Sequence, residues 1–195
     1  MTRMIVSSTV VLAMAAAPAL AQTKQAKAPA AAASKQSADQ KFVMEAAKGG
    51  MAEVELGKLA QEKAASEQVK NFGKRMVDDH GKANDELQTL AKNKNITLPT
   101  DLDPKEKALK DRLSKLSGAA FDRAYMNAMV QDHRKDVNAF KAESTRGQDP
   151  DVKAFASKTL PTLEDHLKLA QQTDKAVGTT GAKSTKKVGT GGAKK

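Results

Sequence analysis

Hydrophobic residues recur at three- and four-residue intervals from residue 39 to residue 177, the period of amphipathic helices. The pattern predicts four long helices at 39–65, 67–94, 119–146 and 150–176, with a short helix at 104–117. Residues typical of helix starts and stops separate them: Ser66, Asp103-Pro104, Gly118, Gly147 and Asp149-Pro150. No segment of 39–177 shows the strict alternation of a strand, so we expect an all-α domain.

Each long helix has one apolar stripe. In chain order the stripes are Phe42, Ala46, Gly49, Leu56 and Ala60; Val69, Phe72, Met76, Ala83, Leu87 and Leu90; Phe121, Tyr125, Met129, Val137 and Phe140; and Val152, Phe155, Leu163, Leu167 and Ala170. Two tight turns and one longer middle connection between such helices predict a four-helix bundle over 39–177. Pro161 is expected to kink the last helix. The alternative is that the first two helices continue through Ser66 as one rod.

The first 21 residues have the pattern of a secretory signal peptide. Arg3 precedes an apolar run from Ile5 to Ala17, and Ala19-Leu20-Ala21 then forms a small-residue cleavage site. We therefore expect cleavage after Ala21 and a periplasmic or secreted protein. Retention of this segment as a membrane anchor is the alternative.

The segments on both sides of the domain lack large apolar residues. Residues 22–38 are mostly Ala, Pro, Lys, Gln and Ser, and residues 178–195 are mostly Gly, Thr, Ala and Lys. Such compositions bury too little surface to offset the entropy of ordering, so we expect a disordered tether and a disordered tail.

The positive charge of the chain is concentrated in these end segments. The net charge is +10, but residues 39–177 contain 24 basic and 23 acidic residues. A DNA-binding domain would more usually have a basic patch on its own surface, so we expect no specific nucleic-acid partner. The tail lysines instead favour a weak electrostatic contact with an anionic envelope surface.

The composition also limits the chemistry of the protein. The absence of cysteine excludes disulfides, thiolate zinc sites, iron–sulfur clusters and a cysteine nucleophile. Aromatic residues make up 3% of the chain, too few for a platform that stacks single-stranded nucleic acid. Any site must be built from His, carboxylates, Met and one Tyr.

All three histidines, His80, His133 and His166, fall on the apolar stripe of their own helix, close to its midpoint. The first helix has Glu53 at the corresponding position, where an unpaired charge would be costly. In a bundle with its helices in register, these four side chains meet in one layer, as in metal sites of helical bundles. The alternative is a buried, metal-free cluster in which Glu53 pairs with one protonated histidine.

Several neighbours of this layer are candidates for supporting roles. Asp79, Asp132 and Asp165 each precede a histidine and lie about 100° around the helix from it, where they could orient an imidazole of another helix or simply be boundary acids. Met76 and Met129 lie one turn before a histidine and would suit Cu(I), although Met is also a common core residue. Tyr125 lies two turns before His133 and could hydrogen-bond into the layer or belong to the core.

Several motifs resemble one family of exported bacterial proteins, called domain of unknown function 4142 and placed in the ferritin-like superfamily. They are Phe42 with Ala46-Ala47, residues 53–60 (EVELGKLA), 76–80 (MVDDH), 121–125 (FDRAY), 131–133 (QDH), and Leu160-Pro161 followed by His166. The resemblance covers about 39–175 and implies a ferritin-like four-helix bundle, but no known reaction.

The sequence departs from the di-iron members of that superfamily. Their paired Glu-x-x-His motifs would place Glu three residues before His80 and His166, where this chain has Val77 and Leu163. Carboxylate-bridged di-iron oxidation or iron storage is therefore not favoured, whereas a single-metal, His-rich site remains open.

Three functions follow from the sequence. The first is an exported protein that binds one divalent transition metal (Zn, Fe, Mn or Cu) through His80, His133, His166 and Glu53. The second is a metal-free envelope or stress-related structural protein whose tails do the binding. The third is a metal-dependent oxidoreductase with an open coordination position near Tyr125.

Overall fold

The computed structural model describes residues 30–186, with side chains described for 38–178. These residues form five helices and no strand: α1 (Ala30–Lys63), α2 (Glu67–Asn93), α3 (Pro104–Ser114), α4 (Gly118–Arg146) and α5 (Pro150–Lys186). The all-α prediction is confirmed. The predicted signal peptide, residues 1–21, and the tail beyond Lys186 lie outside the described residues.

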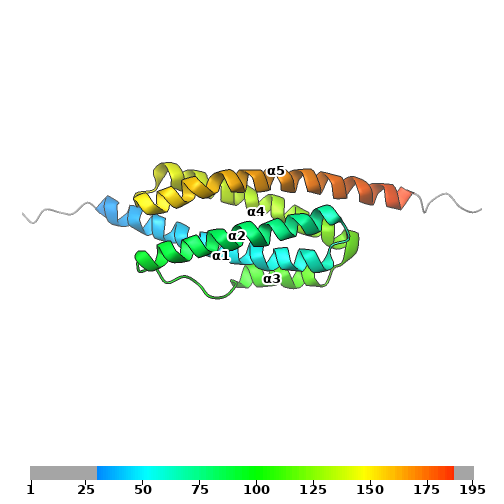
Figure 1. The fold of residues 1–195 in the computed structure, drawn as a ribbon, viewed down its shortest axis with the longest axis horizontal. Coiled ribbons are helices and arrows are strands. Elements are labelled where there is room, and N and C mark those ends of the chain that lie inside the picture. Colours follow the sequence, from blue (N-terminus) through cyan, green and yellow to red (C-terminus); the bar gives the residue numbers. More distant parts are fainter. Residues whose placement is uncertain (1–29, 187–195) are drawn as a thin grey trace, which may run out of the picture.

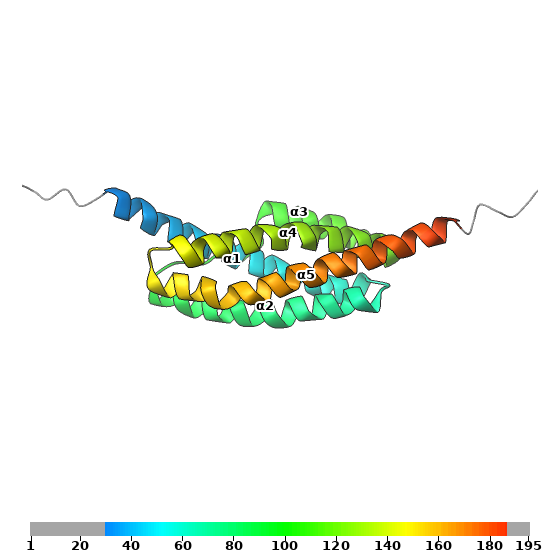
Figure 2. The ribbon, with the colours of Figure 1, turned by 90° about the horizontal axis from the view of Figure 1, so that it is seen from above.

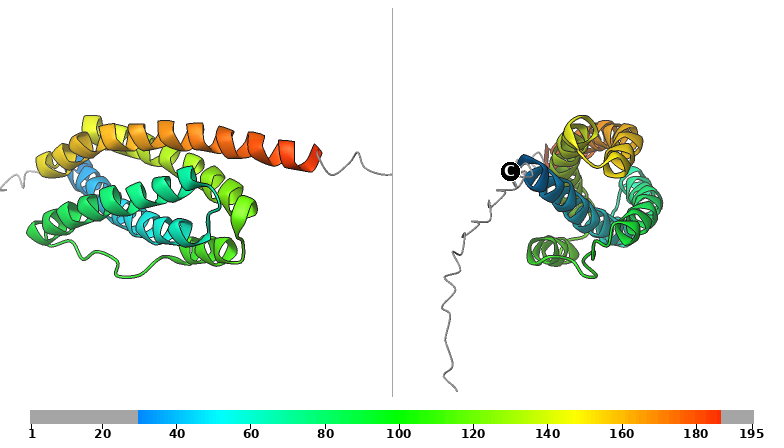
Figure 3. Two further views of the ribbon diagram at one scale, coloured as in Figure 1. Left: turned by 45° about the vertical axis from the view of Figure 1, so that its right-hand side comes forward. Right: turned by 90° about the vertical axis from the view of Figure 1, so that its left-hand side faces the viewer.

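The four long helices form two hairpins that pack together in a bundle-like arrangement (Figure 1). α1 packs along α2 and α4 packs along α5, while further contacts join α1 to α4 and α2 to α5. Figure 3 shows the four helices end-on with α3 outside them, where it contacts α1 and α4. None of the described helices combines the length and apolar character needed to cross a membrane.

A break between α1 and α2 makes the single-rod alternative wrong. The carboxylate of Asp122 on α4 accepts hydrogen bonds from the backbone N–H of Ala65, at 3.1 Å, and of Ser66, at 3.0 Å. Ser66 occupies the predicted N-cap position, but its side chain makes no capping hydrogen bond. The turn is therefore held by a carboxylate from another helix.

The other helix starts follow the sequence closely. Asp103 accepts hydrogen bonds from the backbone N–H groups of Lys105 and Glu106, at 2.9 and 3.0 Å, with Pro104 at the first helical position. Gly118 begins α4 with φ +60°, a conformation that glycine adopts without steric cost.

Two helices extend past their predicted ends, which corrects the helix bounds expected at 39 and 176. α1 starts at Ala30 and α5 reaches Lys186, so these ends project beyond the other helices (Figure 2). Alanine has the highest helix propensity, which favours the extension of α1 through 30–33. Residues 178–186 are weaker helix formers, but a helix that has already formed extends without a new nucleation cost. Pro161 lies inside the continuous α5, and the kink stays a prediction.

The hydrophobic core consists of two clusters. One lies near the α1–α2 turn and includes Leu56, Phe72, Met76, Tyr125 and Met129. The other lies toward the opposite end and includes Val43, Leu87, Phe140, Phe155 and Leu163. In α1 the buried positions Val43 and Ala47 lie one residue after the predicted Phe42 and Ala46, which are only partly buried. On each long helix, the sequence between the two clusters contains one buried polar residue.

Candidate metal centre

Four buried polar side chains, one from each long helix, meet between the two hydrophobic clusters. They are Glu53 of α1, His80 of α2, His133 of α4 and His166 of α5, with exposed fractions of 0%, 6%, 0% and 0%. The ring centroids of the three histidines lie 5.2–5.7 Å apart. One ring nitrogen of each histidine lies within 4.8 Å of a ring nitrogen of the other two. The structure therefore brings together the residues that the sequence places in one layer.

The imidazole of His133 is fixed by its own helix. Its Nδ1 lies 3.0 Å from the backbone carbonyl oxygen of Met129. Because a carbonyl can only accept, Nδ1 carries the proton of this hydrogen bond, which in a neutral imidazole leaves the lone pair on Nε2. Nε2 is buried and has no hydrogen-bond partner among the described residues. His133 thus has one donor nitrogen engaged and one acceptor nitrogen free.

In His166, too, one ring nitrogen has a partner and the other has none, and here the partner is a carboxylate. Its Nε2 lies 2.9 Å from Oδ2 of Asp79 on α2, and the buried Nδ1 has no hydrogen-bond partner in the described structure. Arg75 donates to the same Asp79 oxygen at 3.2 Å. A histidine that donates one N–H to a carboxylate and offers its other nitrogen is the arrangement by which proteins orient metal ligands.

Glu53 lies against two of the histidines. Its Oε2 is 2.6 Å from Nε2 of His80, and its Oε1 is 3.2 Å from Nδ1 of His133. Both contacts are ion pairs when the histidine is protonated, and beyond them Nε2 of His80 and both Glu53 oxygens have no hydrogen-bond partner among residues 38–178. Two unpartnered imidazole nitrogens, of His133 and His166, lie in one buried layer with the His80–Glu53 pair, and imidazole and carboxylate are ligands that Zn, Cu and Fe accept.

In the metal-free protein, the protonation equilibria favour a neutral His166 and a protonated His80 paired with Glu53. Burial raises the pKa of Glu53, but electrostatic interaction with the adjacent His133 and His80 outweighs it and lowers that pKa overall. Burial lowers the pKa of His80, and the Glu53 carboxylate more than reverses this, so the pKa is raised. Burial, reinforced by the other two histidines, lowers the pKa of His166 to about 4 despite its bond to Asp79. His166 is therefore neutral near pH 7, the form that can coordinate a metal.

The pKa of Asp79 is lowered. Burial would raise it, but the hydrogen bonds from His166 and Arg75 outweigh that effect. Asp79 thus remains a carboxylate that can hold the imidazole N–H.

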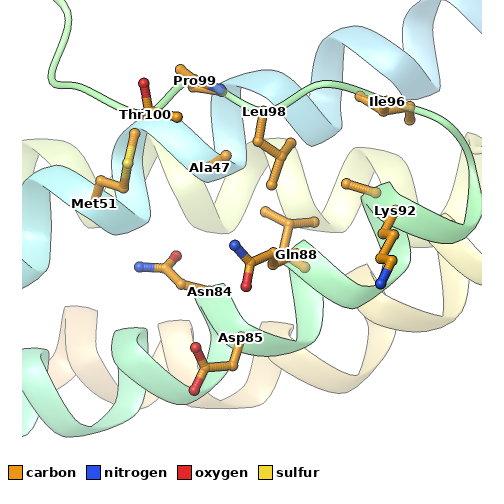
Figure 4. A pocket seen from close by; sticks show the side chains of 12 residues that line it. Ala47, Met51, Asn84, Asp85, Gln88, Lys92, Ile96, Leu98, Pro99 and Thr100 are labelled. Atoms are coloured by element: carbon orange, nitrogen blue, oxygen red, sulfur yellow. The ribbon is translucent and has the colours of Figure 1, made fainter.

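A small pocket leads to the histidines between α2 and α5. Its volume is about 150 Å³, and Asp79, His80 and His166 line it together with the exposed Lys158. The pocket gives an ion or a small molecule a path to the layer. A separate pocket of about 410 Å³ lies under the 96–100 loop, and Figure 4 shows Leu98 pointing from this loop toward the helices that carry Ala47 and Gln88. No histidine lines this second pocket.

The remaining predicted neighbours occupy different environments. Met76, Met129 and Tyr125 are fully buried in the cluster near the α1–α2 turn. The Tyr125 hydroxyl has no hydrogen-bond partner in the described part of the chain, and burial followed by the Glu53 charge raises its pKa well above the usual value. Asp165 is exposed, which places it away from the layer.

Asp132 belongs to a second group of possible ligands. The sequence indicated Glu53 and Asp132 as candidates but not Asp136. One oxygen each of Glu53, Asp132 and Asp136 lies within 4.8 Å of the others. Burial, followed by the charge of Glu53, raises the pKa of Asp132 and raises that of Asp136 further. The only sequence signal for Asp136 was its position one turn after Asp132, which places both on one side of α4.

Comparisons with known proteins agree with this fold. Residues 21–173 match the model of the family described as domain of unknown function (DUF4142), so the chain belongs to that family. A DUF305 protein from Streptomyces coelicolor has a similar structure, with a TM-score of 0.61 and 18% identity over 72% of this chain and 92% of that one. A DUF305 fragment from Deinococcus radiodurans has a TM-score of 0.61 and 13% identity over 72% of this chain and 95% of that one. Curated proteins give no match.

The family membership confirms the resemblance found in the sequence. The DUF305 structures support the helical fold alone, because their identity to this chain is low. The function must therefore be argued from the site.

Proposed function

We propose that this protein is an exported, ferritin-like four-helix bundle that binds a divalent transition-metal ion through His80, His133 and His166, with Glu53 beside them. The proposal rests on the different surroundings of the two ring nitrogens within an imidazole. His133 and His166 each tie one nitrogen to an acceptor, and the other nitrogen stays buried without a hydrogen bond. Leaving a buried polar atom unpaired costs about 1–3 kcal/mol, and a metal ion would remove that cost.

The ligand set suits Zn, Fe, Mn or Cu, and imidazole favours Zn, Cu and Fe among these. A paired-carboxylate iron centre of the ferritin type is not part of the proposal. Leu163, at one of the two positions where such a centre needs Glu, is 2% exposed and belongs to a hydrophobic cluster.

A titration with Co²⁺, a visible substitute for Zn²⁺, tests the site in protein purified without a histidine tag. The wild type should bind Co²⁺ with a tetrahedral-type spectrum and melt at a higher temperature when loaded, because a ligand that binds only the folded state stabilises it. The variant His80→Ala/His133→Ala should lose both effects, whereas Asp165→Asn, at an exposed position beside His166, should keep them. Equal metal-dependent melting shifts in the wild type and the double variant would contradict the proposal.

A metal-free cluster is the second candidate, and the 2.6 Å contact between His80 and Glu53 favours it. In that case His80 is protonated and paired with the buried carboxylate, and the bundle has a structural role. Metal analysis of protein taken directly from the periplasm distinguishes the two. Wild-type protein that neither contains nor takes up a transition metal would support the structural role.

Export rests on the sequence of residues 1–21. N-terminal sequencing of the mature protein should find Gln22 first. A mature chain that still begins at Met1 would mean that the segment is retained.

A further inference from the structure

We propose that the metal centre has a second cation position, formed by the carboxylates of Glu53, Asp132 and Asp136, so that Glu53 is shared between two ions. This inference rests on the proposed histidine site for the shared ligand. The chain would then hold one ion mainly by nitrogen and a neighbouring one by oxygen.

The geometry of the three carboxylates supports such a position. One oxygen of each lies within 4.8 Å of the other two. Asp132 and Asp136 are one helical turn apart on α4 and therefore lie on the same side of it. Glu53 faces them from α1. Three carboxylates at this separation repel one another unless a cation or protons lie between them.

The state of Glu53 provides an independent observation. Its side chain is fully buried, and both of its oxygens lack a hydrogen-bond partner among the described residues. Oε2 has the contact with His80, but Oε1 has only Nδ1 of His133 at 3.2 Å, whose proton is used by the Met129 carbonyl. Oε1 therefore keeps lone pairs for a second partner, as the proposed sharing requires.

The nearby lysines do not neutralise the group. Lys135 lies 3.7 Å from Asp132, but its side chain is 63% exposed, so the pair is weak. Within residues 38–178, Asp136 has neither a hydrogen bond nor an ion pair. Glu106 of α3 adds a fourth carboxylate at the edge of the group. Its Oε1 lies 3.5 Å from Nζ of Lys105, whose side chain is 75% exposed, and its buried Oε2 has no hydrogen bond in the described structure.

A groove gives this side of the centre its own access. It has a volume of about 320 Å³, lies between α1, α3 and α4, and is lined by Glu106, Asp132 and Asp136 among others. The pocket that reaches His80 and His166 lies instead between α2 and α5. An all-carboxylate position suits a hard cation such as Mn²⁺ or Mg²⁺, in contrast to the imidazole side.

The experiment loads tag-free, full-length protein with one equivalent of Zn²⁺ and then titrates Mn²⁺, with free Mn²⁺ followed by electron paramagnetic resonance. Wild-type protein should bind about one further Mn²⁺ ion per chain. Asp136→Asn should weaken Mn²⁺ binding by about tenfold or more and leave the Zn²⁺ content unchanged, because one charged ligand is lost. Asp165→Asn removes a charge from an exposed position and should leave both metals unchanged.

The outcomes separate the two proposals. Equal Mn²⁺ affinity in the wild type and Asp136→Asn, with Zn²⁺ bound, would overturn the second position and leave the histidine site standing. Mn²⁺ binding that depends on Asp136 without any Zn²⁺ uptake would overturn the histidine site and the sharing of Glu53. Asp132→Asn is the second variant should Asp136→Asn fail to fold by circular dichroism, and the same affinity loss is expected for it.

Discussion

Asp79 on α2 and His166 on α5 are hydrogen-bonded across the bundle, with 2.9 Å between Oδ2 and Nε2. This bond sets the proton on Nε2 and leaves Nδ1 directed for coordination. It also joins the two hairpins at the level of the proposed metal ion. In the proposed site, the carboxylate would therefore act on the metal through the imidazole that it orients.

Asp79→Ala should accordingly weaken metal binding without removing a ligand. We expect an affinity loss of about 10–100-fold, as is typical when the partner of a metal-bound histidine is removed. Competition with a colorimetric chelator measures the loss. Asp165→Ala is the matched control, because it removes an exposed acid from the residue next to His166. Equal affinities for the two variants would show that Asp79 does not orient the site.

The sequence was sufficient to predict the four residues of the layer, because each interrupts or joins an apolar stripe of its own helix. Periodicity within one helix places Glu53 or His133 on the inner side. It does not determine how that helix is rotated against its neighbours, and a rotation of one residue amounts to about 100°. The Asp79–His166 bond and the approach of Asp136 to Glu53 depend on that rotation, so they emerge only from the structure.

In the metal-free protein, His166 and His80 should have opposite effects on how stability depends on pH. The folded pKa of His166 is about 4, below its ordinary value of 6.5, so the unfolded chain takes up a proton first and stability falls between pH 6.5 and 4. The pKa of His80 is raised, so its contribution is complete below pH 6.5 and is lost as pH rises through the folded pKa.

Urea unfolding of chelator-treated protein from pH 4 to pH 8 measures both effects. His166→Gln should remove an acid-dependent loss on the order of 3 kcal/mol. His80→Gln should make the protein relatively less stable at acid pH. Parallel pH profiles for the two variants would contradict the opposite shifts.

Glu143, near the α4–α5 turn and ten residues after His133 on α4, predicts a second pH effect. Burial, followed by the charge of Asp39, raises its pKa to about 7. Asp39 accepts backbone hydrogen bonds from Gln148, at 3.0 Å, and Asp149, at 2.7 Å, which join the start of α1 to this turn. Glu143 is an acid with a raised folded pKa, so the folded state is favoured at low pH. That advantage is lost as pH rises from about 4.5 to 7.

Glu143→Gln should therefore have the same melting temperature as the wild type near pH 4.5. Above pH 7 its melting temperature should be higher than that of the wild type. Differential scanning calorimetry at the two pH values measures the difference. A variant that is less stable than the wild type at pH 8 would show that the charged carboxylate stabilises the turn instead.

The basic C-terminus should bind anionic surfaces independently of the metal centre. Five lysines and no acid occur in residues 183–195, and long-range attraction of this kind is screened over ~8 Å at physiological salt. Sedimentation with phosphatidylglycerol vesicles should show binding that fails in high salt. Binding should also be lost when the five lysines are changed to Gln. The variant His80→Ala/His133→Ala should bind normally. Salt-resistant binding by the lysine variant would place the interaction on the helices.

Close backbone contact between α1 and α2 sets the spacing on which the site depends. A Cβ atom at Gly57 would lie 2.6 Å from the backbone oxygen of Gly73, and one at Gly73 would lie 2.7 Å from that of Gly57. Gly57→Ala should force the hairpin apart and destabilise the fold by about 1–3 kcal/mol, as overpacking does. Gly81→Ala, where an added Cβ would meet no atom within 4 Å, should instead stabilise α2 by up to ~1 kcal/mol. Urea unfolding measures the stability of both variants.

Because α1 carries Glu53 and α2 carries His80, Gly57→Ala should also weaken Co²⁺ binding, while Gly81→Ala preserves it. Equal stability of the two variants would mean that the hairpin tolerates a wider spacing.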